Sequence, residues 1–320
     1  MTFLVTGAAG FIGSHLCKVL LKTGCHIVGI DNFDPFYNKK IKEQNIKEIL
    51  NNKNFNFHEL DICENLSILE NYKIDIVIHF ASKVGVIDSI DKADAYSLTN
   101  INGTLNLLNF MKQTGCDKIL FSSSSSVYGN NQLDIFTEDY PANFPLSPYA
   151  VSKRSCEIML YNYHYLFKIN VVCLRLFSVY GPNQRPDLFI HKISKLIISD
   201  LPVIIYGKGD SSRDYTFISD VIGGIISAID YLENNKNVYE IINIGNKKPV
   251  NILFLVHQLY QLFQIPPKII YTNSKKVEMP FTNADIKKSK ILLNYNPKVE
   301  LSEGLMLFHK WFMLNLDAHE

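Results

Sequence analysis

The 320-residue sequence carries almost no excess of charge of either sign, because 32 Lys and Arg residues balance 31 Asp and Glu residues. A net charge of +1 creates no strong field that would attract nucleic acid or an anionic membrane surface. No apolar run approaches the roughly 20 residues that a helix needs to cross a bilayer. We therefore expect neither a nucleic acid nor a membrane as a partner.

The cysteines lack the spacing of a metal site or a disulfide framework. There is no C-x-x-C and no Cys/His pairing at zinc spacing, so we expect no metal. Several cysteines lie in apolar patterns, where a free thiol behaves as a small hydrophobe. The chain begins "MTFLVTG", which is typical of a strand rather than a signal peptide. The sequence therefore predicts a reduced, cytoplasmic protein.

What the sequence does contain is a regular alternation of strand and helix patterns. The segments "TFLVTG", "HIVGID", "FNFHEL", "DIVIHF", "KILFSS" and "VVCLRL" are short, apolar and rich in β-formers. Helical patterns cover residues 11–24, 39–52, 96–115 and 147–167, and two of them end on Gly24 and Gly115. This alternation predicts right-handed βαβ units and an α/β fold with a Rossmann-type, doubly wound parallel sheet.

The first predicted strand ends in "TGAAGFIG", which places Gly7, Gly10 and Gly13 between a strand and a helix. Glycines there permit a tight turn and a close approach to a pyrophosphate, and the helix N-terminus favours negative charge. Asp31 follows at the end of the second strand, where a carboxylate accepts the adenosine ribose hydroxyls and repels a 2′-phosphate. The pattern predicts NAD rather than NADP, although Asp31 in isolation would also suit a helix or turn cap.

Other polar residues end neighbouring strands. Asp61 ends the third strand and could reach the adenine, "HFASK" ends the fourth, and "FSSSSSVYG" ends the fifth. In open α/β sheets these carboxyl ends line the ligand crevice. In "SPYAVSK", Ser147 could cap a helix that stacks Tyr149 and Lys153 on one face. A nearby ammonium would favour the tyrosine phenolate as a base, although the same pair is also common on surface helices.

After residue 176 the alternation gives way to loops rich in Pro, Gly and Asn, with isolated helices. The stretch "NVYEIINIG" is expected to return one strand to the sheet. We predict an NAD-binding Rossmann domain over residues 1–175 plus about 216–245. A smaller nucleotide-sugar-binding domain is predicted over 176–215 and 246–320.

Taken together, the glycine triplet, Ser124 and Tyr149-x-x-x-Lys153 resemble the extended short-chain dehydrogenase/reductase family. Over nearly its whole length the chain is similar to the nucleotide-sugar epimerases of that family, through "LRLFSVYGPNQRPD", "YGKGDSSRDYTFISDV" and "TNADIKKSKILLNYNPKVELSEGL". The "SSSSVYG" and "YGPNQRPD" stretches look most like those of UDP-glucuronate 4-epimerases.

This resemblance implies a role for each matching residue. Tyr149 would take the proton of the sugar 4-hydroxyl, Ser124 would bind the same hydroxyl, and Lys153 would hold the nicotinamide ribose. NAD would be held by Gly7, Gly10, Phe11, Ile12, Gly13, Asp31, Asn32, Asp61, Ile62, Phe80, Ala81, Ser82, Lys83, Asn100, Ser122, Tyr149, Lys153 and Phe177. The UDP-sugar would contact Val86, Ser124, Ser125, Ser126, Tyr149, Ser178, Arg185, Tyr206, Arg213 and Lys275.

Two of these assignments have alternatives. Arg213 would bind the diphosphate, but it could instead pair with Asp210 or Asp214. Arg185 would bind the sugar carboxylate, but it could simply pair with Asp187 on a loop. A further arginine that related epimerases use for the diphosphate is missing, and Lys275 or Lys276 is nearest to its place. A lysine supplies charge there without the bidentate fork.

The expected reaction is C4 epimerisation of a UDP-sugar through a 4-keto intermediate, with UDP-glucuronate giving UDP-galacturonate. Ser125 and Ser126 stand where the dehydratases have an acidic pair, and Ser126 where uronate decarboxylases carry Glu, which disfavours both activities. The alternatives are UDP-N-acetylglucosamine (or its uronate) or UDP-glucose as substrate, a UDP-glucuronate decarboxylase, a simple dehydrogenase, and a non-catalytic NAD-binding protein. The resemblance also implies a homodimer, in which residues 98–114 and 149–167 of each subunit form a four-helix bundle.

Overall fold

The computed structural model describes residues 1–129, 134–273 and 279–316. Its centre is a seven-stranded sheet in the order β10-β6-β5-β4-β1-β2-β3, and all neighbouring strands are parallel. The strands are β1 (Thr2–Thr6), β2 (His26–Asp31), β3 (Phe55–Glu59), β4 (Ile76–His79), β5 (Lys118–Ser124), β6 (Asn170–Leu176) and β10 (Tyr239–Ile244). The strand order reverses between β1 and β4, which is where doubly wound sheets bind ligands. The predicted Rossmann-type fold is confirmed.

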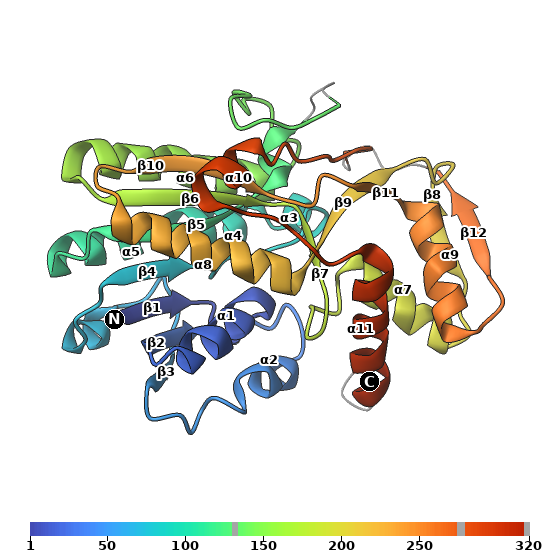
Figure 1. Ribbon diagram of the computed structural model, residues 1–320, viewed down its shortest axis with the longest axis horizontal. Helices are drawn as coiled ribbons and strands as arrows, with labels where there is room; N and C mark the ends of the chain where they lie inside the picture. Colours follow the sequence, from blue (N-terminus) through green and yellow to red (C-terminus); the bar gives the residue numbers. More distant parts are fainter. Residues whose placement is uncertain (130–133, 274–278, 317–320) are drawn as a thin grey trace.

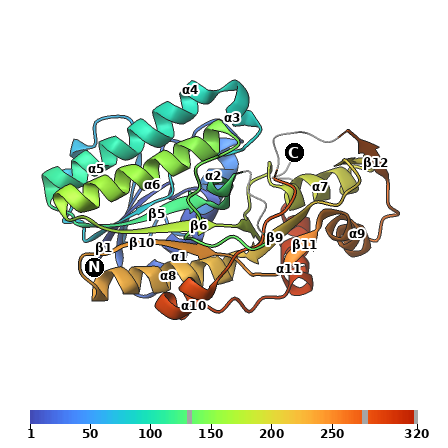
Figure 2. The same cartoon turned by 90° about the horizontal axis from the view of Figure 1, so that it is seen from above.

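Helices cover both faces of the sheet (Figure 2). One face carries α1 (Phe11–Lys22), α2 (Lys39–Ile46) and α8 (Ile218–Asn234); the other carries α3 (Asp88–Asp91), α4 (Ala93–Tyr96), α5 (Gly103–Thr114) and α6 (Pro148–Phe167). Successive strand residues serve opposite layers, because side chains alternate along a strand. Phe3 and Val5 join the core beneath α1 and α8, whereas Leu4 joins the core beneath α5 and α6.

Two of the predicted helices differ from expectation. The pattern over 39–52 gives a helix that ends at Ile46, and the side chain of Asn52 accepts a hydrogen bond from the Asn54 N–H at 3.0 Å. Asparagine favours such a local turn, which here leads the chain into β3. The pattern over 96–115 begins with a π-helical turn, Ser97–Asn102, before α5. The apolar periodicity does not distinguish this wider turn from an α-helix.

A smaller region lies beside the sheet, at the right of Figure 1. It contains a three-stranded sheet of β7 (Ser178–Tyr180), β9 (Ser212–Phe217) and β11 (Pro249–Asn251), and the parallel pair β8 (Val203–Tyr206) and β12 (Ile269–Thr272). Its helices are α7 (Phe189–Ile198), α9 (Ile252–Phe263) and α11 (Leu301–Leu314), while α10 (Lys287–Leu293) packs against α8 and β10.

The chain crosses between the two sheets by very short links. Only Phe177 separates β6 from β7, β9 runs directly into α8, and residues 245–248 separate β10 from β11. The carboxylate of Asp214 ties these links together, since it accepts hydrogen bonds from the N–H groups of Asn246, Lys247 and Ala284 at 2.7, 2.9 and 2.9 Å. The two regions are therefore joined at several points beside the sheet's carboxyl end.

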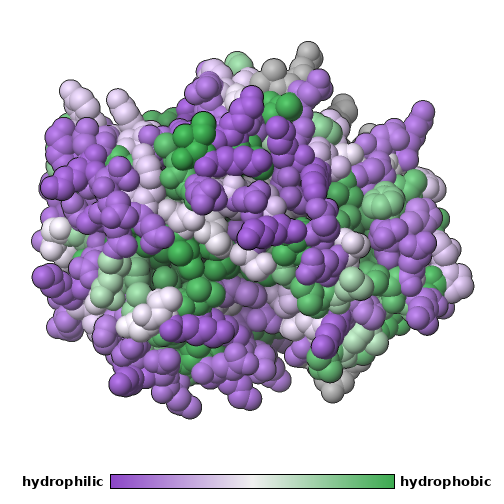
Figure 3. Space-filling view, in the orientation of Figure 1, coloured by the Kyte–Doolittle hydropathy of each residue, from purple (hydrophilic) through white to green (hydrophobic). Residues whose placement is uncertain are grey.

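Most of the surface in the view of Figure 3 is hydrophilic, and apolar residues gather between α8 and α1. Across the described ranges, none of the helices is both long and apolar enough to cross a membrane.

Candidate active site

A large cavity of about 1210 Å³ lies at the carboxyl ends of the central strands and extends to the smaller region. Nearly all of the predicted cofactor residues line it: Gly7, Gly10, Phe11, Ile12, Gly13, Asp31, Asn32, Asp61, Ile62, Phe80, Ala81, Ser82, Lys83, Ser122, Tyr149, Lys153 and Phe177. So do eight of the predicted substrate residues: Val86, Ser124, Ser125, Ser126, Tyr149, Ser178, Arg185 and Arg213. Asn100 and Tyr206 do not line it, and Lys275 falls outside the described residues.

The glycine turn between β1 and α1 forms a cradle that side chains would fill. Gly7 has φ +70°, and a Cβ there would lie 2.8 Å from the Ala81 nitrogen. A Cβ on Gly13 would lie 2.2 Å from the Gly7 carbonyl oxygen, so only glycine lets the helix approach the turn. No side chain caps the N-terminus of α1, and its first turn contains no acid. These free helical N–H groups and the positive end of the dipole suit a pyrophosphate.

The end of β2 presents a buried carboxylate. Asp31 accepts hydrogen bonds from the N–H groups of Ala9 and Phe33 at 3.2 and 2.9 Å, and it pairs with Lys42 at 3.3 Å. Asn32 donates a 2.6 Å hydrogen bond to Asp61, which orients both side chains. This arrangement fixes acceptors at the cavity wall where the sequence predicts the adenosine.

Asn100 has a different position from the one predicted. It accepts a hydrogen bond from the Lys83 N–H at 2.7 Å and donates to the Lys83 carbonyl and the Ser152 hydroxyl at 3.0 and 2.8 Å. It therefore braces the loop after β4 against α6 instead of facing the cavity. The Lys83 side chain pairs with Asp34 at 2.7 Å. Burial opposes the ionisation of Asp34, but the hydrogen bond and charge of Lys83 outweigh it and lower the carboxyl pKa.

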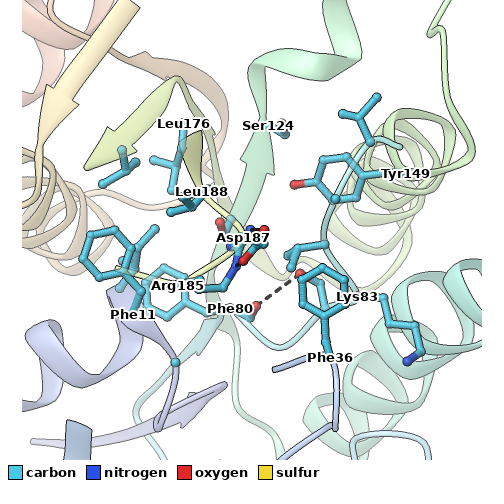
Figure 4. A pocket seen from close by; sticks show the side chains of 18 of the residues that line it. Phe11, Phe36, Phe80, Lys83, Ser124, Tyr149, Leu176, Arg185, Asp187 and Leu188 are labelled. Atoms are coloured by element: carbon cyan, nitrogen blue, oxygen red, sulfur yellow. Dashed lines mark hydrogen bonds and ion pairs between the residues drawn. The ribbon is translucent and has the colours of Figure 1, made fainter. Parts of the chain in front are cut away.

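Tyr149 lies in the first turn of α6. Ser147 caps this helix by accepting a hydrogen bond from the Ala150 N–H at 3.2 Å, and Pro148 occupies the first turn. The Tyr149 hydroxyl faces Ser124 across the cavity (Figure 4). Burial raises the pKa of Tyr149, and the hydrogen bond with Ser124 and the charge of Arg185 partly oppose that rise.

Lys153, one turn further along α6, is buried, and its ammonium points to the sheet. Its Nζ donates a 2.8 Å hydrogen bond to the Ser122 carbonyl and lies 5.0 Å from the centre of the Phe121 ring. Burial lowers the pKa of Lys153 to about 8. We expected the lysine charge to favour the Tyr149 phenolate; the groups that do so in this structure are Ser124 and Arg185, because the ammonium is directed at the strand carbonyl.

Arg185 lies in the middle of the cavity, beside Asp187 (Figure 4). Its Nε and Nη2 donate to the two Asp187 carboxylate oxygens at 2.9 and 2.8 Å, and the arginine side chain is 21% exposed. The alternative expectation of an Arg185–Asp187 pair is thus present in the structure. It does not remove Arg185 from the site, since both residues line the cavity. The Nη1 end of the guanidinium, among the described residues, has no hydrogen-bond partner.

The serine run after β5 folds into a short turn at the same place. Ser124 donates to the Ser126 hydroxyl at 3.1 Å and accepts a hydrogen bond from the Ser126 N–H at 3.1 Å. Ser125 and Ser126 line the cavity, as does Ser178 from β7. These three serines, which were predicted to contact the UDP-sugar, therefore line the cavity that also contains Arg185.

On the smaller region's side, Arg213 of β9 lines the cavity, and its Nη1 donates to the Ser212 carbonyl at 3.1 Å. Thr282 also lines it, and its hydroxyl accepts a hydrogen bond from the Asp214 N–H at 3.0 Å. Tyr206, at the end of β8, is 40% exposed and lies outside the cavity. A contact between Tyr206 and uracil stays a prediction.

The lining residues that sequence reasoning missed include Tyr37, Lys42 and Tyr96. The rings of Tyr96 and Tyr149 meet edge to face, 6.3 Å apart, and the Tyr96 hydroxyl donates to the Val84 carbonyl. None of the three belongs to a motif with a recognisable spacing, so the sequence offers no signal for them. Elsewhere in the described parts of the chain, no three His, Cys, Asp or Glu residues cluster as a metal site would require.

A doubly wound sheet, a glycine cradle and a Tyr-x-x-x-Lys pair in one cavity define an extended short-chain dehydrogenase/reductase. Residues 4–307 match the family model described as GDP-mannose 4,6 dehydratase. Because that match covers nearly the whole sequence, the chain belongs to this family.

Several relatives carry a more specific name. The chain is 38% identical over 319 residues to UDP-glucuronate 4-epimerase of Thermodesulfobacterium geofontis, covering 98% of this chain and 97% of that protein. It is 31% identical to UDP-glucuronate 4-epimerase 1 of Arabidopsis thaliana, over 98% of this chain and 77% of that protein. UDP-glucuronic acid 4-epimerase of Bacillus cereus, solved with UDP-glucuronic acid and NAD, has a TM-score of 0.92 and 39% identity, over 98% of this chain and 99% of that one.

Proposed function

We propose that this protein is an NAD-dependent UDP-glucuronate 4-epimerase, which inverts C4 of the sugar through a transient 4-keto intermediate and yields UDP-galacturonate. The observation that carries the proposal is the meeting of Tyr149, Ser124 and Arg185 in the cavity that also contains the glycine cradle. Similarity to proteins named UDP-glucuronate 4-epimerase, over nearly the whole chain, supports it.

The cavity fits NAD in its glycine cradle and its strand-end carboxylates. The uncapped N-terminus of α1, beside Gly7 and Gly13, would hold the pyrophosphate. Asp31 would accept the ribose hydroxyls, while Asp61 and Ile62 would border the adenine. When bound, NAD⁺ accepts a hydride from the sugar C4 and returns it to the opposite face. Residues 1–175 with about 216–245 would form the NAD-binding domain, and the remainder would bind the nucleotide sugar.

Residues of this chain would remove the proton of the sugar 4-hydroxyl. Tyr149 would accept it as the phenolate, and Ser124, which faces Tyr149, would hold the hydroxyl in reach. Burial raises the Tyr149 pKa, so a positive charge that arrives with the cofactor would act in the needed direction. Lys153 would bind the nicotinamide ribose from its position on Ser122.

Other residues of the cavity would bind the charged C6 group of the sugar. Arg185 would bind the carboxylate through its free Nη1 end, while Asp187 holds the other edge of the guanidinium. Ser125, Ser126 and Ser178 would donate to the same group and keep it in the sugar plane, which opposes loss of CO₂ from a 4-keto uronate. Dehydration would need an acid and a base where Ser125 and Ser126 stand, so the family's name does not describe this site. Arg213 would bind the diphosphate, and Val86 would contact the sugar.

The test is proton NMR of the purified protein, incubated separately with UDP-glucuronate, UDP-glucose and UDP-N-acetylglucosamine and without added cofactor. A mixture of 4-epimers from UDP-glucuronate alone is the expected result. An epimer from either neutral sugar instead would retain the Tyr149 chemistry and refute the carboxylate assignment. A pentose product would indicate decarboxylation, and a stoichiometric demand for free NAD⁺ would indicate a simple dehydrogenase. No turnover of any sugar after NAD⁺ is added would refute the proposal.

The outer face of α5 and α6 supports a homodimer. These helices lie side by side away from the sheet (Figure 2), and they expose Leu105, Val151, Ile158, Tyr161 and Tyr165. A second copy covering this stripe would complete a four-helix bundle. Sedimentation velocity on Ile158→Glu should show monomers. Ile291→Glu, which changes a more exposed isoleucine on the opposite side of the sheet, should leave the dimer intact. A monomeric wild type would refute the dimer.

We also propose that the protein acts in the cytoplasm. Its six cysteines are all free thiols, and four of them are buried. A reducing compartment keeps such thiols unpaired.

A further inference from the structure

Glu157, on the catalytic helix, is a fully buried carboxylate that the proposed chemistry does not use. It is 0% exposed and lies two turns beyond Tyr149 and one turn beyond Lys153 on α6. Side chains four residues apart stack on one helix face, so Tyr149, Lys153 and Glu157 form a single row. A buried carboxylate is costly unless it is paired and hydrogen-bonded. The contacts of the Glu157 carboxylate therefore have to explain why it is stable in a buried position.

Four donors satisfy the Glu157 carboxylate. Arg175 of β6 binds it with Nε and Nη2, both at 2.9 Å, and Arg154 contributes a contact at 2.9 Å. The Ser123 hydroxyl donates a short hydrogen bond of 2.6 Å. Arg175 is itself only 1% exposed and lies over the Tyr128 ring, 4.7 Å from its centre. Burial opposes the ionisation of Glu157, but Arg175, Ser123 and Arg154 outweigh it and lower its pKa.

The same three residues of the row meet three consecutive serines of the sheet. The Ser122 carbonyl accepts a hydrogen bond from the Lys153 ammonium, the Ser123 hydroxyl donates to Glu157, and Ser124 faces Tyr149 across the cavity. Of these three residues of the row, only Glu157 also forms an ion pair within the described parts of the chain, and its partner Arg175 comes from the neighbouring strand β6. Sliding α6 by a fraction of a turn would break the hydrogen bonds of Lys153 and Glu157 together and would move Tyr149 away from Ser124.

We propose that Glu157 is a positioning residue of the proposed epimerase, which locks the register between α6 and β5 and balances the buried ammonium of Lys153. The proposal rests on the proposed function of the site. Its chemistry is electrostatic as well as steric, because the negative charge of Glu157 acts on Lys153 from one turn away. Arg175 and Ser123 hold that charge in place.

The charged and titratable groups around Lys153 determine the sign of the expected effect. Glu157 and Cys156 of α6 favour its charged form, while His79 of β4 faces it as a neutral, buried imidazole. Arg154 and Arg175 lie beyond Glu157 and are compensated by it. Removing the Glu157 charge therefore lowers the Lys153 pKa below its value of about 8, since two uncompensated arginines remain nearby.

The first variant is Glu157→Gln, which keeps the shape of the side chain and removes its charge. We expect kcat for UDP-glucuronate to fall about tenfold at neutral pH, with KM within about twofold of the wild type. The alkaline limb of the kcat profile should move down by about one pH unit. Glu240→Gln is the matched control. Glu240 of β10 pairs with Lys288 of α10, and neither residue lines the cavity. It should change neither quantity.

A second variant separates positioning from simple stability. Glu157→Leu combined with Arg175→Met replaces the buried ion pair by apolar side chains, an exchange that is often neutral or stabilising. We expect the double variant to unfold near the wild-type urea midpoint and yet to keep the lowered kcat and the shifted alkaline limb. A double variant with wild-type stability, wild-type kcat and a wild-type pH profile would overturn the proposal.

A third measurement needs no turnover. NMR titration of ¹³C-labelled lysine Cε, with Lys153 assigned from Lys153→Arg, reports the Lys153 pKa in the wild type and in Glu157→Gln. A decrease of about one unit is expected, and an unchanged value would refute the electrostatic role of Glu157. If the wild type turned over no sugar, the proposed function would fail, but this titration would still decide the role of Glu157.

Discussion

Replacing Arg185 by lysine tests the carboxylate assignment most directly. The substitution keeps the positive charge, which opposes the rise of the Tyr149 pKa, but it removes the planar fork whose Nε and Nη2 now hold Asp187. The free Nη1 end, which would bind the sugar carboxylate, is removed as well. The neutral C6 group of UDP-glucose needs none of these interactions. The variant should therefore affect the two substrates differently.

The expected magnitude follows from the hydrogen bonds that the Nη1 end would make to the sugar. One or two charge-assisted hydrogen bonds to a carboxylate contribute together roughly 2–4 kcal/mol. Removing them corresponds to about a 30- to 900-fold decrease in kcat/KM for UDP-glucuronate. For UDP-glucose, any residual kcat/KM should change by less than about fivefold. The assay is a coupled measurement of each 4-epimer at several substrate concentrations.

Arg185→Met adds a second comparison, because it removes the charge too. It should slow both sugars at neutral pH, since the Tyr149 pKa then rises further above its ordinary value. Asp187→Asn is the control for the pair, because it leaves Arg185 in place and weakens only its anchor. If Arg185→Lys lowered kcat/KM equally for UDP-glucuronate and UDP-glucose, the carboxylate assignment would be wrong.

Three further predictions concern the base, the glycine cradle and a buried histidine. Tyr149→Phe should lower kcat at least about 1000-fold while the purified variant still retains NAD, measured by absorbance after denaturation; retained activity would contradict its role as base. Gly13→Ala should abolish NAD retention, because its Cβ would lie 2.2 Å from the Gly7 carbonyl oxygen, whereas Gly223→Ala, with no atom within 4 Å, should retain it. Burial lowers the pKa of His79 from 6.5 to about 3, so the unfolded chain binds a proton that the folded chain excludes, and stability falls as the pH drops through this window. Between pH 7 and 5 the wild type should lose about 2 kcal/mol of unfolding free energy more than His79→Gln, measured by urea titration; equal losses would contradict the buried neutral imidazole.

The central sheet could be predicted from the sequence because its strands are buried on both faces. Continuous apolar segments such as "DIVIHF" are unambiguous in that setting, and the glycine turn after β1 fixes where the ligand edge begins. The small strands β7, β8, β11 and β12 have three or four residues each and are only partly buried, so their patterns are too short to recognise.

The site was predictable where a motif states the chemistry and unpredictable where contacts are long-range. Tyr149, Lys153 and Ser124 belong to recognisable spacings, and the structure brings them to one cavity. The pairing of Glu157 with Arg175 has no such signal, because the two residues come from a helix and a strand whose register only the fold determines. Asn100 shows the reverse case, since its polar side chain is used within the protein, between Lys83 and Ser152, and its contact with NAD stays a prediction.

The short links between the two sheets have a consequence for how ligands enter. Phe177, the direct passage from β9 into α8, and residues 245–248 join the two regions at three places. The Asp214 carboxylate of β9 also binds the N–H groups of Asn246, Lys247 and Ala284. A hinge motion needs a single flexible connection, whereas here all of the short links would have to bend at once. Opening by rotation of one region against the other is thereby made costly. We therefore expect the two regions to keep their relative placement when a ligand enters the cavity.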